Sequence, residues 1–277
     1  ATGKLNWKIM EPFFVNAPWL DSSAAAVPEP LRHFYLAQSY NGSEMILRAL
    51  EEVNKAIGLD SGNPDFYVLK TRLHLKQNKS PAAAAAALAA LALSSRTIPA
   101  ILKMSEDLYL KDAKAVYGKT IELGTREVDP YLEMGNIALH HKELNEAEKW
   151  LDQARKIVPD RPDVLLSWGR LMLARKELQK AKEALEQSRD RGEDTGLLHA
   201  ALGELYSGLK LWDRAVESYQ RAFKIRAGEV DWRHAMGVAL DRLGRKKEAE
   251  QKFREVLALR PDDAEAWQEL RRLGARY

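Results

Sequence analysis

The sequence predicts an all-α fold, a solenoid built from antiparallel helix pairs, and three observations support this prediction. Glycine recurs at a constant interval of 34 residues in the C-terminal half of the chain. An alanine follows each of these glycines by twelve residues, and a bulky side chain follows each alanine by four. The three columns are Gly135, Gly169, Gly203 and Gly237; Ala147, Ala181, Ala215 and Ala249; and Leu151, Leu185, Tyr219 and Phe253. Self-similarity at one fixed period of this length indicates stacked supersecondary units.

Each column has a physical role in a pair of helices. A bulky residue stands directly before every glycine, where it shares one helical stripe with the residue three positions beyond the glycine. The glycine lets the second helix of the same unit approach closely, and the alanine does the same on that second helix. Pro159 and Pro261 stand where a second helix should stop. Every unit of 34 residues is therefore predicted to be an antiparallel helix pair.

These columns resemble the tetratricopeptide repeat, a helix-turn-helix unit that carries an aromatic residue, leucine-glycine, tyrosine, alanine, phenylalanine and proline in that order. Unit 230–263 matches best, through Met236, Gly237, Leu240, Ala249, Phe253 and Pro261. Unit 128–161 matches nearly as well, through Tyr131, Met134, Gly135, Ala147, Leu151 and Pro159. Four in-register units thus cover residues 128–263. The resemblance implies a right-handed superhelical solenoid.

Residues 30–127 fit the same frame more loosely. They predict degenerate tetratricopeptide-like units that begin near Pro30, Pro64 and Ser94. Pro99 is expected to interrupt the first helix of the last of these units, since proline breaks a helix interior. Together with the four clear units they give a solenoid of about seven units.

Segments at the two ends of the chain stand outside the repeats. Residues 264–277 predict a C-terminal capping helix with Trp267, Leu270 and Leu273 facing inward and arginines facing outward. Residues 1–29 mix prolines with the aromatic residues Trp7, Phe13, Phe14 and Trp19. Prolines oppose a long helix, yet so many rings are unusual for a disordered tail. We therefore expect an extended N-terminal segment that packs on the solenoid as a cap or lies in its groove.

Composition and charge argue against several classes of function. Hydrophobic residues make up 45% of the chain and charged residues 30%, as expected for a repeat protein with a continuous core. The 43 basic and 40 acidic residues are interspersed and the net charge is only +3, so we expect no nucleic-acid partner. The longest apolar stretch, residues 81–93, is shorter than the roughly 20 residues that span a bilayer. Direct membrane insertion is not expected.

Residues that could carry chemistry form no recognisable catalytic set. The chain has no cysteine, which excludes disulfides and thiolate catalysis. His140 and His141 are adjacent in an expected turn and lack the i, i+4 spacing of a helical zinc site. The glycines are separated by whole units, so no Gly-rich phosphate loop exists. We expect no catalytic residues, no metal and no cofactor, in a chain that is not an enzyme.

The resemblance also implies a concave groove, lined mainly by first helices, that binds peptides or extended protein segments. The groove positions are Asn136, Arg170, Glu204 and Val238, with Arg272 in the cap and Tyr35, Leu69, Arg72 and Leu102 upstream. The apolar upstream residues either line the groove or belong to the core, because the register before residue 128 is open. Arg170 and Glu204 would add charge-assisted hydrogen bonds to a ligand.

The function expected from this reading is a non-enzymatic scaffold or adaptor for protein binding, with assembly of a bacterial envelope complex as one use. The alternative is a regulatory or substrate-recruiting region of an enzyme whose catalytic part lies outside this chain. Self-association of the solenoid is a further alternative. The sequence leaves the compartment open; the absence of cysteine leans toward the bacterial periplasm or envelope, with the cytoplasm as the other choice.

Overall fold

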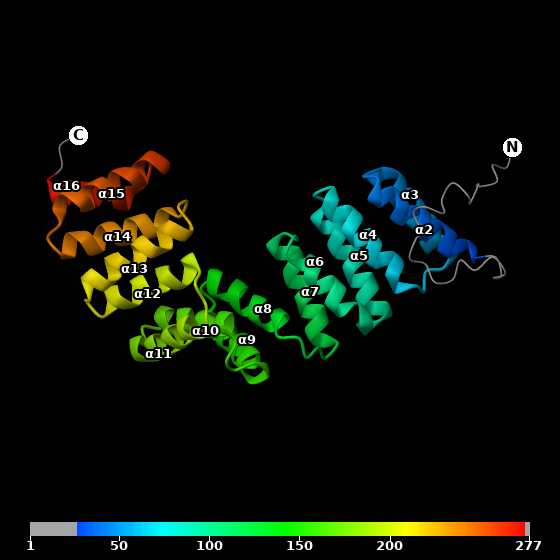
Figure 1. Ribbon diagram of the computed structural model, residues 1–277, viewed down its shortest axis with the longest axis horizontal. Coiled ribbons are helices and arrows are strands. Elements are labelled where there is room, and N and C mark those ends of the chain that lie inside the picture. Colours follow the sequence, from blue (N-terminus) through cyan, green and yellow to red (C-terminus); the bar gives the residue numbers. More distant parts are fainter. Residues whose placement is uncertain (1–26, 275–277) are drawn as a thin grey trace. The chain divides into compact units, whose positions relative to one another are not determined.

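The computed structural model describes residues 27–274, and within them it contains fifteen α-helices, one short 3₁₀ helix and no strand (Figure 1). The all-α prediction is therefore confirmed. The chain divides into two compact units, Ala1–Thr125 and Arg126–Tyr277. The expected N-terminal segment over residues 1–29 lies outside the described residues except for its last three positions, and α2 already begins at Glu29.

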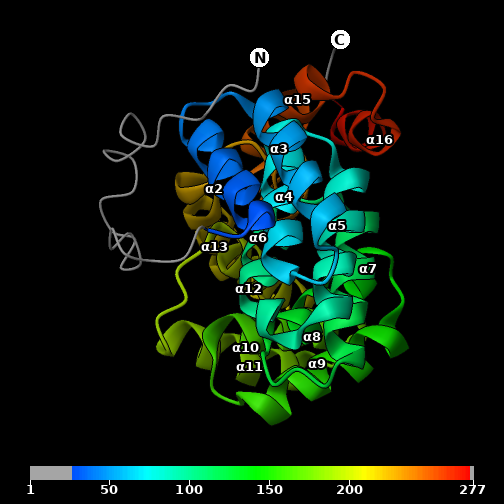
Figure 2. The same ribbon diagram turned by 90° about the vertical axis from the view of Figure 1, so that its right-hand side faces the viewer.

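The first unit consists of three helix pairs. They are α2 (Glu29–Gly42) with α3 (Ile46–Leu59), α4 (Pro64–Lys76) with α5 (Ser80–Leu93), and α6 (Ile98–Ser105) with α7 (Leu110–Glu122) (Figure 2). Prolines occupy the first turns of α2, α4, α5 and α6, where the missing amide donor costs nothing. The interruption expected at Pro99 takes the form of a 3₁₀ turn, Ser95–Thr97, before α6, which has only eight residues.

The core of the first unit combines small and large side chains. Ala37, Val53, Phe66 and Leu73 are buried together between the first two pairs. In α5, the alanines that face inward are buried and allow its neighbours to approach closely. Ser80, at the start of α5, donates a hydrogen bond to Asp112 Oδ2 (2.5 Å) and accepts one from the Tyr109 amide (2.8 Å). These bonds fix the start of α5 to the start of α7.

The second unit continues with four helix pairs and a final helix. They are α8 (Asp129–His140) with α9 (Leu144–Ile157), α10 (Pro162–Ala174) with α11 (Leu178–Asp190), α12 (Gly196–Gly208) with α13 (Trp212–Ile225), α14 (Val230–Arg242) with α15 (Lys246–Leu259), and α16 (Ala264–Leu273). Pro159 and Pro261 lie just beyond the ends of α9 and α15, as the sequence predicts. In α16, Leu270 is buried, and Trp267 and Leu273 pack partly buried against the core.

The turn inside each pair of the second unit is built in one way. Residues at the same repeat position, Lys142, Lys176, Lys210 and Gly244, all have positive φ. In the second pair, the amide of Lys176 donates to the Leu173 carbonyl (2.8 Å) and the next amide donates to the Met172 carbonyl (2.9 Å). These bonds satisfy carbonyls at the end of the first helix and reverse the chain over a few residues.

The repeated glycines mark the closest approach inside each pair. A Cβ placed on Gly135 would lie 2.5 Å from Leu151 Cδ2, and one on Gly169 would lie 2.6 Å from Leu185 Cδ2. At Gly203 the nearest atom belongs to the ring of Tyr219, at 2.7 Å. The glycine column and the bulky column therefore contact each other directly, which explains why both recur with the same period.

The second unit has an inner and an outer side. Its successive first helices, α8, α10, α12 and α14, lie against one another, whereas successive second helices approach one another less closely. A stack of pairs that is tighter on one side curves toward that side. Side chains on the first helices therefore line the inner face of this unit, and the second helices spread apart on its outer face.

Candidate functional site

The predicted groove residues of the second unit occupy one repeat position on its successive first helices. Asn136, Arg170, Glu204 and Val238 stand on α8, α10, α12 and α14, at the same repeat position of adjacent helices. Each directly follows a column glycine, so its side chain leaves the helix beside the contact with the second helix. None of the four is fully buried. The fold therefore presents a polar pair, Arg170 and Glu204, between an amide and a valine.

Arg170 and Glu204 carry opposite charges on adjacent helices without forming a direct bond. Among residues 27–274, neither side chain makes a hydrogen bond or a close ion pair. Burial lowers the pKa of Arg170 and raises the pKa of Glu204, and the attraction between them offsets part of each shift. Glu204 is nevertheless open to solvent and Arg170 is half-buried. A group that is accessible yet surrounded by protein atoms is typical of a concave surface.

Glu204 directly follows Gly203, and the ring that packs on this glycine belongs to a buried tyrosine. Tyr219 packs its ring against Gly203, and burial raises the pKa of its phenol, which the nearby Glu204 carboxylate raises further. The phenol therefore stays neutral at physiological pH. The neutral phenol adds no charge near Glu204. Arg170 is the cation whose attraction acts on the Glu204 carboxylate.

The amide and the cap arginine at the two ends of the row already have partners. Ser167 Oγ donates to Asn136 Oδ1 (2.8 Å), which joins α10 to α8 and leaves the amide NH₂ of Asn136 as a donor. Arg272 on α16 forms ion pairs with Asp241 (2.5 Å) and Glu269 (2.6 Å), which raise the pKa of its guanidinium. Arg272 is thus bound within the protein, and Arg170 is the arginine of the row with its donors unused.

The upstream positions belong to the first unit. Leu69 and Leu102 are only 4% and 8% exposed and lie in its packed interior. Tyr35 is half-buried, and burial raises the pKa of its phenol. Arg72 is exposed on α4. Of the four, Arg72 offers the most accessible polar group.

Sequence reasoning missed a feature of the outer face. Between α11 and α13 the structure has a cavity of about 210 Å³ that is lined by arginines, and between α13 and α15 it has a second one of about 480 Å³. Comparing residues 34 positions apart on the second helices would have found the arginines. Choosing these positions requires knowing which faces of the helices spread apart. Only the three-dimensional arrangement shows this.

The described residues offer neither a metal site nor a helix that could span a membrane. Within residues 27–274, no cluster of three or more histidine and carboxylate side chains is arranged to hold a metal ion. In the same part of the chain, no helix combines the length and the apolar character needed to cross a bilayer.

The repeated helix pairs define the class of helical-repeat proteins. Within that class, the profile of the tetratricopeptide repeat matches residues 198–228 and 233–266. Residues 198–228 and 233–266 are therefore tetratricopeptide repeats, as the sequence columns indicated, and the described fold is that of a tetratricopeptide-repeat solenoid. No curated protein sequence matches it significantly.

Solved structures with similar folds support the same assignment. A chain of the APC/C hetero-tetramer Cut9-Hcn1 is 18% identical, with a TM-score of 0.65 over 91% of this chain and 50% of its own. A tetratricopeptide repeat protein from Parabacteroides merdae is 14% identical, with a TM-score of 0.60 over 88% of this chain and 98% of its own. Pseudomonas aeruginosa pilF is 15% identical, with a TM-score of 0.54 over 74% of this chain and 95% of its own. This chain thus spans half the length of the Cut9-Hcn1 chain, and the likeness concerns the fold alone.

Tetratricopeptide repeats bind proteins or peptides, so the fold supports an interaction scaffold.

Proposed function

We propose that this chain is a non-enzymatic scaffold that binds a peptide or an extended protein segment along the inner face of its second unit. The observation that carries the proposal is the pair Arg170 and Glu204. They lie on adjacent first helices, burial disfavours the charged form of each, and neither has a hydrogen-bonded partner among the described residues.

Removing a charge from water is unfavourable unless another group compensates for it. Burial already disfavours the charged form of both side chains, as the directions of their pKa shifts show. A partner that places a carboxylate or carbonyl on Arg170 and an amine or amide on Glu204 would supply the missing hydrogen bonds. In this partly desolvated setting such charge-assisted bonds are stronger than on an open surface.

The neighbouring positions suggest how a segment would lie. Asn136 offers an amide NH₂ on α8, and Val238 offers an apolar side chain on α14. A segment that crosses the four first helices would therefore meet a donor, a cation, an anion and an apolar surface in order. This order of groups would fix the direction in which the bound segment runs.

The proposal is tested by affinity capture from the source cell followed by mass spectrometry. The wild type is compared with the double variant Arg170→Glu, Glu204→Arg, which keeps the net charge. The control is Glu250→Arg, Arg254→Glu, which exchanges an ion pair (2.8 Å) on α15. A partner that the wild type and the control retain, but the inner-face variant loses, supports the proposal. Equal recovery with all three proteins would overturn it.

Capturing from envelope and soluble fractions separately extends the same experiment to the proposed use in envelope assembly. We expect the partner to be recovered from the envelope fraction. A partner found in the soluble fraction alone would contradict this part of the proposal without affecting the binding surface.

A further inference from the structure

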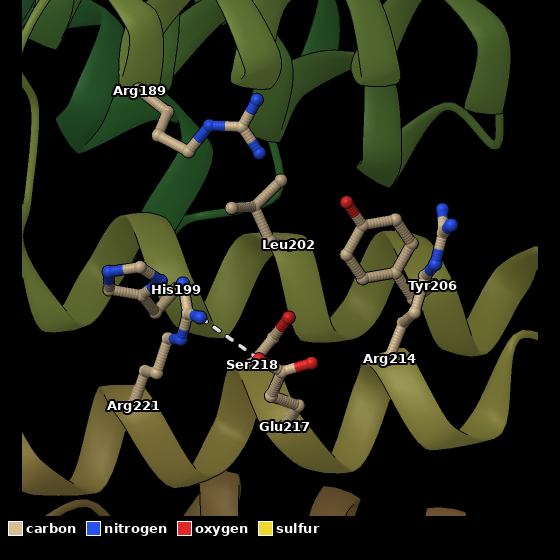
Figure 3. Close-up of a pocket in the computed structure, with 8 residues that line it drawn as sticks. All are labelled: Arg189, His199, Leu202, Tyr206, Arg214, Glu217, Ser218 and Arg221. Atoms are coloured by element: carbon tan, nitrogen blue, oxygen red, sulfur yellow. Dashed lines mark hydrogen bonds and ion pairs between the residues drawn. The ribbon is translucent and has the colours of Figure 1, made fainter.

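The outer face of the second unit contains a cavity between α11 and α13, which we call the arginine furrow. It measures about 210 Å³ (Figure 3). Its lining residues are Arg189 from α11; His199, Leu202 and Tyr206 from α12; and Arg214, Glu217, Ser218 and Arg221 from α13. Figure 3 shows Arg189 on one side of the furrow and the polar residues of α13 on the other, with Leu202 and Tyr206 between them.

Positive charge exceeds negative charge in the arginine furrow. Arg221 Nη2 donates to Glu217 Oε1 (2.9 Å), and Arg189 donates to Asp190, its neighbour in the chain (3.0 Å). Arg214 has no carboxylate partner among the described residues, and its guanidinium lies 5.9 Å from the centre of the Tyr206 ring. Three guanidinium groups and one carboxylate line the furrow, so a negative ligand is favoured.

The base of the furrow is rigid and partly polar. His199 is 5% exposed, and its Nε2 is hydrogen-bonded to Asp194 Oδ1 (2.7 Å), which fixes the ring. Tyr206 is 8% exposed and Leu202 is buried, so they provide a packed apolar surface between the arginines. Buried, fixed side chains below cationic ones are a suitable arrangement for holding a small charged group.

The next furrow of the same unit provides an internal comparison. The cavity between α13 and α15 is lined by the eight residues that stand 34 positions after those of the arginine furrow. They are Phe223, Arg233, Met236, Leu240, Glu248, Gln251, Lys252 and Glu255. There, glutamates replace Arg214 and Arg221, and Lys252 forms an ion pair with Glu255 (2.8 Å). The stacking of pairs thus opens a cavity at both steps. The second cavity is lined by three cationic residues, Lys224, Arg233 and Lys252, and by two glutamates, so its excess of positive charge is smaller than that of the arginine furrow.

The preceding step differs again. Arg155 occupies the repeat position of Arg189, and its guanidinium lies 4.1 Å from the centre of the Trp168 ring. Trp168 stands where the arginine furrow has the smaller Leu202. Arg155 stacks on the Trp168 ring, so at this step the guanidinium makes a cation–π contact within the protein.

We propose that the arginine furrow binds a carboxylate of an acidic peptide segment. Guanidinium groups on two opposing helices can hold a carboxylate by bidentate hydrogen bonds, with Arg214 as the arginine that has no carboxylate partner among the described residues. The volume suits one acidic side chain, and the Tyr206 ring and Leu202 offer contact for its methylene groups. The furrow lies on the outer face, so this site is independent of the inner-face surface proposed above.

The test is fluorescence anisotropy with a fluorescein-labelled hexaglutamate peptide. We expect Arg214→Glu to weaken binding about tenfold or more, because it removes a charge-assisted hydrogen bond and adds repulsion. The control is Arg242→Glu, which makes the same charge change on an exposed arginine of α14 outside the furrow, and its affinity should equal that of the wild type. Thermal melting verifies that both variants are folded.

The proposal is overturned if the peptide does not bind the wild type, if Arg214→Glu and Arg242→Glu lose affinity equally, or if inorganic phosphate binds at the furrow where the peptide does not. The double variant Arg170→Glu, Glu204→Arg should bind hexaglutamate as the wild type does. A loss in that variant would place the acidic segment on the inner face and would also overturn the proposal.

Discussion

The contact between the repeated glycine and the bulky residue of the second helix can be tested by adding one methyl group. In Gly169→Ala the new Cβ would lie 2.6 Å from both Cδ2 and Cγ of Leu185 and 3.4 Å from its backbone nitrogen. Leu185 is fully buried and cannot swing away. Overpacking of this kind costs about 1–3 kcal/mol.

Alanine is also a better helix former than glycine, by about 1 kcal/mol. The two effects oppose each other, and we expect a net loss of up to about 2 kcal/mol in the free energy of unfolding. Gly118→Ala is the matched control, because Gly118 lies inside α7 and a Cβ there would have no atom within 4 Å. That variant should gain up to about 1 kcal/mol.

The assay is urea unfolding followed by circular dichroism, with Gly169→Ala, Leu185→Ala and the double variant. Leu185→Ala alone should cost about 2–5 kcal/mol. In the double variant the methyl group introduced at position 169 enters the space that the leucine side chain leaves, so the two losses should not add. If Gly169→Ala stabilised the protein as Gly118→Ala does, the close-contact explanation of the 34-residue period would be refuted.

Two further predictions concern the core and the inner face. Phe253→Ala should lower the free energy of unfolding by about 3–5 kcal/mol, because the ring is fully buried. Leu259→Ala, at a 55% exposed position, should change it by no more than about 0.5 kcal/mol. Equal losses of stability in thermal unfolding would contradict the assigned register. Glu204 should titrate above the ordinary glutamate range by NMR because burial raises its pKa, and Arg170→Gln should raise that pKa further by removing the opposing attraction. The pKa of Glu204 is higher in the folded than in the unfolded protein, so the contribution of Glu204 favours folding at low pH and is lost as the pH rises through the folded pKa. A Glu204 titration in the ordinary glutamate range would refute the prediction.

The repeat columns allowed much of the second unit to be predicted, because each column reports one physical contact. Gly169 and Leu185 recur together since they touch, and Pro159 stands beyond the end of α9 since it cannot continue the helix. Contacts of this kind are local to one helix pair. A single sequence therefore contains enough information to place them.

Other features could not be predicted from columns. The sequence could not assign Leu69 and Leu102 to the core or to the groove. The reason is that the short helix α6 and its preceding 3₁₀ turn shift the repeat spacing in the first unit. Their burial depends on neighbours in other helices. The arginine furrow likewise depends on how far second helices spread apart, a property of stacked units and not of any one unit.

The assignment of binding to the inner face is tested most directly by site-specific photo-crosslinking in the source cell. Benzoylphenylalanine replaces Leu197, which is 37% exposed on α12 and stands two turns before Glu204. The control position is Gln153, an exposed residue on the second helix α9. The inner-face proposal predicts a crosslinked partner from position 197 that disappears in the Arg170→Glu, Glu204→Arg background and is not formed from position 153. The same partner crosslinked from position 153 and missing from position 197 would contradict it.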